Sequence, residues 1–141
     1  NNKAVWTNFL NDSVKKTITM PDYSQEILSA FYFARCINFS KYKPGDKISI
    51  PNFLLEGEIY PFYLEYVGKE AIETDLGIFS CYVLRPLLQE GRIFKGQKEM
   101  TIWISDDGLN IPIRAKTEII VGSIKMDLVE YKNLIKPLSK Q

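Results

Sequence analysis

Histidine is absent from this sequence of 141 residues. Its absence excludes Ser-His-Asp and Cys-His catalysis, general-base chemistry by imidazole, and any zinc site that needs an imidazole ligand. Glycine-rich phosphate loops are missing as well, because no segment resembles the Walker or the dinucleotide-binding pattern. A hydrolase that uses two carboxylates remains as an alternative, but the spacing of the acidic residues in 56–75 singles out no pair. We therefore expect a protein that is not an enzyme and holds no cofactor.

Excess charge and long apolar segments are missing too. The chain has 18 Lys and Arg against 17 Asp and Glu, a formal net charge of +1. Nucleic-acid binding depends on clustered Lys and Arg, so we do not expect it. No apolar run approaches the ~18–20 residues that cross a bilayer, and we expect no transmembrane segment. The 45% hydrophobic and 25% charged residues indicate one folded, β-rich domain over residues 1–141.

Cysteine is scarce, with Cys36 and Cys81 as the two examples. Two cysteines are too few to define a disulfide framework. One interpretation is a pair of small, buried, apolar side chains. The other is a Cys36–Cys81 disulfide, which requires an oxidising compartment and Cα atoms within ~7 Å of each other.

The first third of the chain predicts two strands and a helix. Residues 4–10 and 13–20 are expected to pair as short strands. A helix is expected over about residues 24–38, because apolar residues repeat there at helical spacing. Asp22 and, three residues later, Gln25 form a capping-box pattern at its start.

From residue 47 to 131 the pattern is that of β-strands. Apolar and polar residues alternate in several short runs, which is typical of strands with one buried and one solvated face. Gly122 predicts a bend or bulge between two of these runs. The fold class is therefore mainly β: a curved antiparallel sheet or partly open barrel of six to eight strands, with one helix at about 24–38 packed across it.

Asp106 and Asp107, followed by Gly108, form the sharpest local cluster in the sequence. Two carboxylates at a tight turn are able to bind a hard cation such as Ca²⁺, but the spacing and the closing Glu of an EF-hand are missing. The alternative is a hairpin turn whose Asp side chains accept hydrogen bonds from local backbone amides. Arg114 lies on the strand after the turn and is expected to pair with one of the two aspartates. We favour this structural interpretation and predict no metal site.

Aromatic residues are plentiful. Phe31 and Tyr32 lie on the expected helix, and a second group lies on the strand around residues 58–67: Tyr60, Phe62, Tyr63 and Tyr66. Together they could line a pocket for a lipid-like or glycan ligand. The alternative is that they form the core, with tyrosines at its rim.

Several segments in a fixed order carry a family resemblance. They are SQEILSAFYFAR (24–35), YKPGDKI (42–48), YVGKE (66–70), GIFSC (77–81), WISDD (103–107), IPIR (111–114) and VGSI (121–124). In sequence and order they resemble the DUF3108 family, exported proteins of unknown function from Gram-negative bacteria. The resemblance covers about residues 20–138 and transfers no catalytic residue.

The resemblance implies a β architecture and a location in the periplasm or at the outer membrane. The chain is similar to the C-terminal half to two thirds of the family domain, and absent strands would leave an edge that pairs into a homodimer. Our leading hypothesis is a non-catalytic exported domain that binds a hydrophobic or amphipathic ligand or a cell-envelope component. The alternative is a structural or interaction module that pairs through an exposed strand edge.

Overall fold

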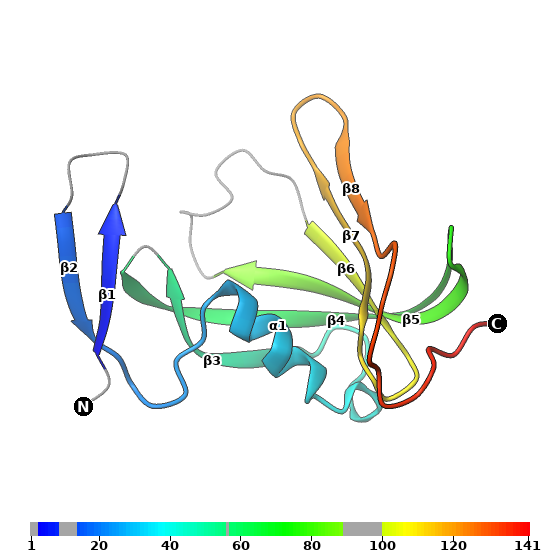
Figure 1. The fold of residues 1–141 in the computed structure, drawn as a ribbon, viewed down its shortest axis with the longest axis horizontal. Helices are drawn as coiled ribbons and strands as arrows, with labels where there is room; N and C mark the ends of the chain where they lie inside the picture. Colours follow the sequence, from blue (N-terminus) through cyan, green and yellow to red (C-terminus); the bar gives the residue numbers. More distant parts are fainter. Residues whose placement is uncertain (1–2, 9–13, 56, 89–99) are drawn as a thin grey trace.

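The computed structural model describes residues 3–8, 14–55, 57–88 and 100–141. Six strands form one antiparallel sheet in the order β3-β4-β5-β6-β7-β8, and β1 pairs with β2 in a separate hairpin (Figure 1). The elements, in chain order, are β1 (Lys3–Asn8), β2 (Val14–Thr19), α1 (Ile27–Arg35), the 3₁₀ turn η1 (Phe39–Lys41), β3 (Lys47–Leu55), β4 (Glu58–Thr74), β5 (Gly77–Leu88), β6 (Met100–Ser105), β7 (Pro112–Glu118) and β8 (Ser123–Asp127).

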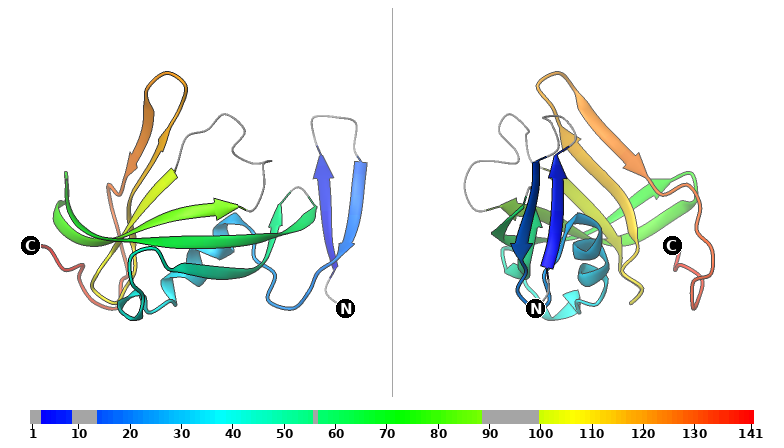
Figure 2. Two further views of the ribbon diagram at one scale, coloured as in Figure 1. Left: turned by 180° about the vertical axis from the view of Figure 1, so that it is seen from behind. Right: turned by 60° about the vertical axis from the view of Figure 1, so that its left-hand side comes forward.

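The six-stranded sheet is curved and open. Its two edges are β3 and β8, and the β7–β8 hairpin projects away from the side of the sheet where β3 lies (Figure 2). The predicted curved antiparallel sheet with one helix is thus confirmed. The alternative of a β-barrel is wrong, because the projecting hairpin keeps β8 from pairing with β3.

A bulge allows β3 to pass a proline without ending. Ile50 pairs with Phe62 and Phe53 pairs with Tyr60, so that two residues, one of them Pro51, stand opposite Pro61 alone. Proline has no N–H to donate to the ladder, and here the prolines of both strands fall at the same irregular position. Pro51 lies inside β3, which is an edge strand of the sheet.

Two further bulges change the face toward which residues point. In β4, Tyr66 pairs with Leu84 and Gly68 pairs with Val83, which leaves Val67 as an extra residue. Side chains alternate between faces along a strand, so one extra residue reverses the alternation beyond it. A similar register shift in the β6–β7 pair skips Ile113. Buried residues before and after these bulges therefore lie on opposite faces of the sheet.

The helix is shorter than the expected span of 24–38. Its N-cap is Glu26, whose carboxylate accepts hydrogen bonds from the backbone amides of Leu28 and Ser29 at 2.9 and 2.6 Å. The expected start with Asp22 and Gln25 is wrong, because the backbone of Gln25 pairs with β3: its amide donates to the carbonyl oxygen of Asn52 at 3.0 Å.

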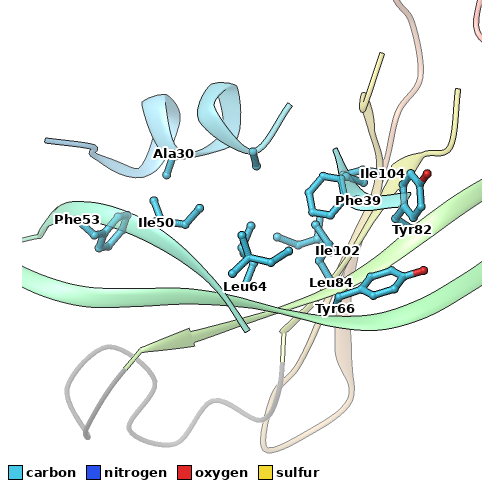
Figure 3. Packing of buried hydrophobic residues seen from close by; sticks show 12 residues of the cluster. Ala30, Phe39, Ile50, Phe53, Leu64, Tyr66, Tyr82, Leu84, Ile102 and Ile104 are labelled. Carbon is cyan, nitrogen blue, oxygen red and sulfur yellow. The ribbon is translucent and has the colours of Figure 1, made fainter. Parts of the chain in front are cut away.

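Buried residues form two clusters on opposite faces of the sheet. The first cluster lies between α1 and β3–β6, where Ala30 faces Ile50, Leu64 and Phe53 (Figure 3). The second cluster lies on the other face and is covered by the C-terminal segment, whose Leu138 is buried. The members of the second cluster are Ile72, Phe79, Cys81, Leu109, Ile111, Ile113 and Leu138.

Candidate functional site

An apolar cavity of about 260 Å³ lies between α1 and the face of the sheet that it crosses. Helix residues Ile27, Ala30, Phe31 and Ala34 form one wall. The opposite wall comes from five strands, with Phe53 and Leu55 on β3, Phe62 and Leu64 on β4, Leu84 and Pro86 on β5, Met100, Ile102 and Ile104 on β6, and Pro112 on β7. Engineered cavities of about 150 Å³ bind benzene, so this space can hold a larger apolar group.

Small side chains on the helix leave the space open. Ala30 and Ala34 are buried and stand one turn apart on the face of α1 that meets the sheet. Ile27 lies one turn earlier; it lines the cavity and is also 52% exposed. An aromatic stack of Phe53 and Phe62, with ring centres 4.5 Å apart, forms part of the sheet wall. On the helix side the cavity is thus bounded by Ala30 and Ala34 together with the larger Ile27 and Phe31, and on the other side by bulky strand residues.

Two polar residues occur among the described residues of the lining, Arg35 and Asn110. Asn110 is buried, and its side-chain amide donates to the carbonyl oxygens of Arg35 and Ile37 at 2.9 and 2.8 Å. It therefore satisfies carbonyl groups at the end of the helix. Arg35 is half-buried, and its Nε donates to the carbonyl oxygen of Leu109 at 3.3 Å. These bonds join the turn after β6 to the end of α1.

The structure separates the six aromatic residues that the sequence grouped. Phe31 and Phe62 both line the cavity. Tyr32 is 68% exposed on the outside of the helix. Tyr63, next to Phe62 in β4, and Tyr60 are half-buried and outside the described lining.

Tyr60 and Tyr66 both have partners within the fold. Tyr60 donates a hydrogen bond to the carboxylate of Glu58 at 2.8 Å. Tyr66 is buried in the first cluster, with its ring 6.0 Å from that of Tyr82 in an edge-on arrangement. Burial and the neighbouring Asp106 raise the pKa of Tyr82 to about 12. Tyr66 therefore belongs to the core beyond the end of the cavity.

Several lining residues were not singled out by sequence reasoning. They include Ala30, Ala34, Met100, Ile102, Ile104 and Asn110. Strict alternation along β6 places residues 102 and 104 on one face of the strand, and the helical repeat places Ala30 and Ala34 on one face of α1. Asn110 follows the turn at Asp106–Gly108, and its position depends on a left-handed backbone with φ of 50°, which asparagine adopts more readily than most residues.

The turn after β6 anchors the C-terminal segment. The carboxylate of Asp107 accepts hydrogen bonds from the hydroxyl of Ser105 at 2.8 Å, from the amide of Leu109 at 2.9 Å and from the amide of Ser139 at 3.3 Å. Asp106 forms an ion pair with Lys69 of β4. Asp107 thus accepts the local hydrogen bonds of a structural turn, and both carboxylates also bind groups from distant segments.

Arg114 has a different partner from the one expected. It donates to both carboxylate oxygens of Asp127, at 2.6 and 2.8 Å, and to the carbonyl oxygen of Glu73 at 2.8 Å. The expected pairing with Asp106 or Asp107 is wrong, because Arg114 stands directly opposite Asp127 in the β7–β8 register. The guanidinium of Arg114 lowers the pKa of Asp127 to about 2.

The cysteines are both free, so the expected alternative of a Cys36–Cys81 disulfide is not formed. Cys36 is exposed directly after α1, whereas Cys81 is fully buried in the second cluster. The two side chains therefore lie in different environments. Burial raises the pKa of the Cys81 thiol to about 12.

Within the residues that the structure describes, no three metal-ligating side chains gather at one point. In the same part of the chain, no helix has both the length and the apolar character needed to cross a membrane.

A family model described as "Protein of unknown function (DUF3108)" matches residues 1–129. The chain belongs to the DUF3108 family. The match includes the β1–β2 hairpin, α1 and the whole six-stranded sheet, and so covers the cavity on both sides. Searches of curated proteins and of solved structures find no match. Because the family description assigns no activity, the function of this DUF3108 domain has to be argued from its site.

Proposed function

We propose that this DUF3108 domain binds a hydrophobic or amphipathic ligand in the cavity between α1 and the sheet and catalyses no reaction. The observation that carries the proposal is the cavity itself: about 260 Å³ bounded by a helix whose inward face bears alanines. Protein interiors are normally packed to the density of organic crystals. A space of this size in the main core is therefore a candidate binding site.

The lining favours an apolar ligand over a glycan. A glycan needs many hydrogen-bonding partners, whereas the described lining offers Arg35 and Asn110, and Asn110 already binds two carbonyl groups. It also contains no carboxylate, hydroxyl or thiol side chain among its described residues. Catalysis by two carboxylates or by a nucleophile has no support at this position.

A series of neutral straight-chain alcohols, from hexanol to dodecanol, tests the proposal by isothermal titration calorimetry. Each added methylene that enters the cavity is expected to tighten binding about fourfold, because burying it contributes about 0.8 kcal/mol. Once the cavity of about 260 Å³ is full, further methylenes remain in solvent. Affinity should then stop rising.

Two matched variants place the binding site. Ala30→Leu extends into the cavity and should weaken decanol binding at least about tenfold, since it occupies the space of three methylenes. Ala71→Leu makes the same chemical change at an exposed position of β4 and should leave binding unchanged. Absence of saturable binding by every alcohol, or equal binding by both variants, would reject the proposal.

Location at the cell envelope is the part of the proposal that depends on the family resemblance of the sequence motifs. Export to the periplasm or outer membrane predicts that the native protein fractionates with markers of those compartments. Recovery with cytosolic markers would remove this part and leave ligand binding untouched.

A second candidate function is pairing of two chains through β8. This strand forms one edge of the open sheet, and Ile124 and Met126 on it are 49% and 56% exposed. An exposed apolar edge strand favours pairing with another strand. Light scattering over a concentration series should show a dimer that Met126→Lys shifts toward monomer; a strict monomer at all concentrations would exclude this function.

A further inference from the structure

Arg35 is the cationic residue of the described cavity lining. It is half-buried in the last turn of α1, so that it contacts both the cavity and solvent. Its Nε donates to the carbonyl oxygen of Leu109 at 3.3 Å, and its guanidinium carbon lies 5.8 Å from the centre of the Tyr32 ring. Neither contact neutralises the charge.

No carboxylate of the described residues forms an ion pair with Arg35. Three described carboxylates form ion pairs with other cations instead: Asp106 with Lys69, Glu65 with Arg85, and Asp127 with Arg114. With Nε bound to a carbonyl group, the two terminal nitrogens of Arg35 keep four N–H donors for another acceptor. The guanidinium lies beside the exposed ring of Tyr32, where an anionic head group outside the cavity can reach these donors.

A purely structural role is the competing explanation. A cation in the last turn interacts favourably with the carbonyl end of a helix, and the bond to Leu109 links Arg35 to the turn after β6. Such a role acts on the stability of the helix. It gives no reason for the affinity of a ligand to depend on the charge that the ligand carries.

We infer that the ligand is a single-chain anionic amphiphile whose alkyl chain fills the cavity and whose carboxylate or phosphate binds Arg35. This inference rests on the proposed function and adds the class of ligand to it. The geometry of an arginine fork matches the paired oxygens of both kinds of anion. Arg35 lines the cavity, and its guanidinium lies beside the exposed ring of Tyr32, so an alkyl chain in the cavity and a head group at the surface of the helix fit one molecule.

Calorimetric titration with decanoate, decyl phosphate, decanol and decyltrimethylammonium tests the inference. Wild-type protein should bind the two anions about tenfold more tightly than decanol, and the cation most weakly. The ratio of the two anion affinities distinguishes a carboxylate from a phosphate head group. Higher salt should reduce the preference for anions.

Three variants assign the preference to Arg35. Arg35→Gln should reduce the ratio of anion to decanol affinity from about ten to about one, and Arg35→Lys should keep part of the preference. Lys41→Gln removes one positive charge from the exposed Lys41 of η1, outside the described lining, and should change neither the affinity for anions nor that for decanol. Melting curves of all variants establish that they are folded.

The outcomes separate the inference from the proposed function. If wild-type protein binds decanol and decanoate equally, the anionic ligand class is excluded while apolar binding stands. If Arg35→Gln weakens all four ligands to the same degree, Arg35 has a structural role and the inference fails. If no ligand binds, the proposed function fails first.

Discussion

Filling the cavity from the helix side should stabilise the protein. Ala30 is buried and lines the space, and Ala30→Leu adds three carbon atoms that point toward Ile50 and Leu64 (Figure 3). Burying three methylenes contributes about 2.4 kcal/mol. Fixing the rotamers of the new leucine costs about 0.5–1 kcal/mol. We expect the free energy of unfolding to rise by about 1.5 kcal/mol.

Urea unfolding followed by tryptophan fluorescence measures this change. The midpoint should rise while the slope with urea stays constant, because the surface exposed on unfolding hardly changes. In a thermal melt the same gain corresponds to an increase of several degrees. Ala71→Leu, at an exposed position of β4, should stay within about 0.5 kcal/mol of the wild type.

The sign of the change tests the reasoning. Forcing a larger side chain into a filled core costs about 1–3 kcal/mol. If Ala30→Leu lowers the free energy of unfolding by that amount while Ala71→Leu does not, the space beside α1 is not available to a side chain. The basis for a ligand at this position would then be lost.

Three further predictions concern groups outside the cavity. Arg114 lowers the pKa of Asp127 from its ordinary 3.8 to about 2. The ion pair therefore stabilises the fold above about pH 4. This contribution, about 1–2 kcal/mol, is lost as the pH falls from 4 to 2. Urea unfolding at several pH values should show the loss in the wild type and not in Asp127→Asn. Native iodoacetamide labelling followed by mass spectrometry should modify exposed Cys36 and spare Cys81, which is buried with a pKa of about 12. Glu26→Ala removes the N-cap of α1 and should lower the free energy of unfolding by about 1 kcal/mol in urea.

Each of these predictions has a clear contrary result. Equal acid profiles for the wild type and Asp127→Asn would mean that the ion pair contributes nothing to folding. Labelling of Cys81 at the rate of Cys36 in native protein would contradict its burial. Unchanged stability of Glu26→Ala would show that the amides at the start of α1 are satisfied without this carboxylate.

Strand patterns were readable from the sequence because the sheet has two chemically distinct faces. Ile102 and Ile104 both lie in the first cluster, as simple alternation along β6 predicts. The same rule would place Ile111, Ile113 and Ala115 on one face, but Ile111 and Ile113 lie in the second cluster, whereas Ala115 packs against the first. The register shift at Ile113 reverses the faces, and a bulge depends on the partner strand, which a single-strand pattern does not contain.

The sequence suggested a pocket lined by aromatic residues, but only some of the residues named for it line the cavity. Phe31 and Phe62 line the cavity, but their sequence neighbours Tyr32 and Tyr63 do not. Successive residues turn by about 100° on a helix and point to opposite faces of a strand. Adjacent aromatic residues therefore cannot all line one pocket. The helical and strand periods separate the residues that face the cavity from their neighbours that face away from it.

Partners from distant segments could not be predicted at all. The hydrogen bonds of Asn110 to the end of α1 join residues more than seventy positions apart. The C-terminal segment also makes contacts of this kind: the amide of Ser139 donates a hydrogen bond to the carboxylate of Asp107, and Leu138 is buried in the second cluster. These contacts depend on how the β6–β7 turn and the C-terminal segment are placed by the whole sheet.

The two clusters differ in how fully they are packed. The second cluster is closed by the C-terminal segment, whereas the first leaves about 260 Å³ beside Ala30 and Ala34. Larger side chains at these two positions would bury more apolar surface. Alanines at both positions therefore fit the proposal that a ligand occupies the space, and the stability of Ala30→Leu tests it.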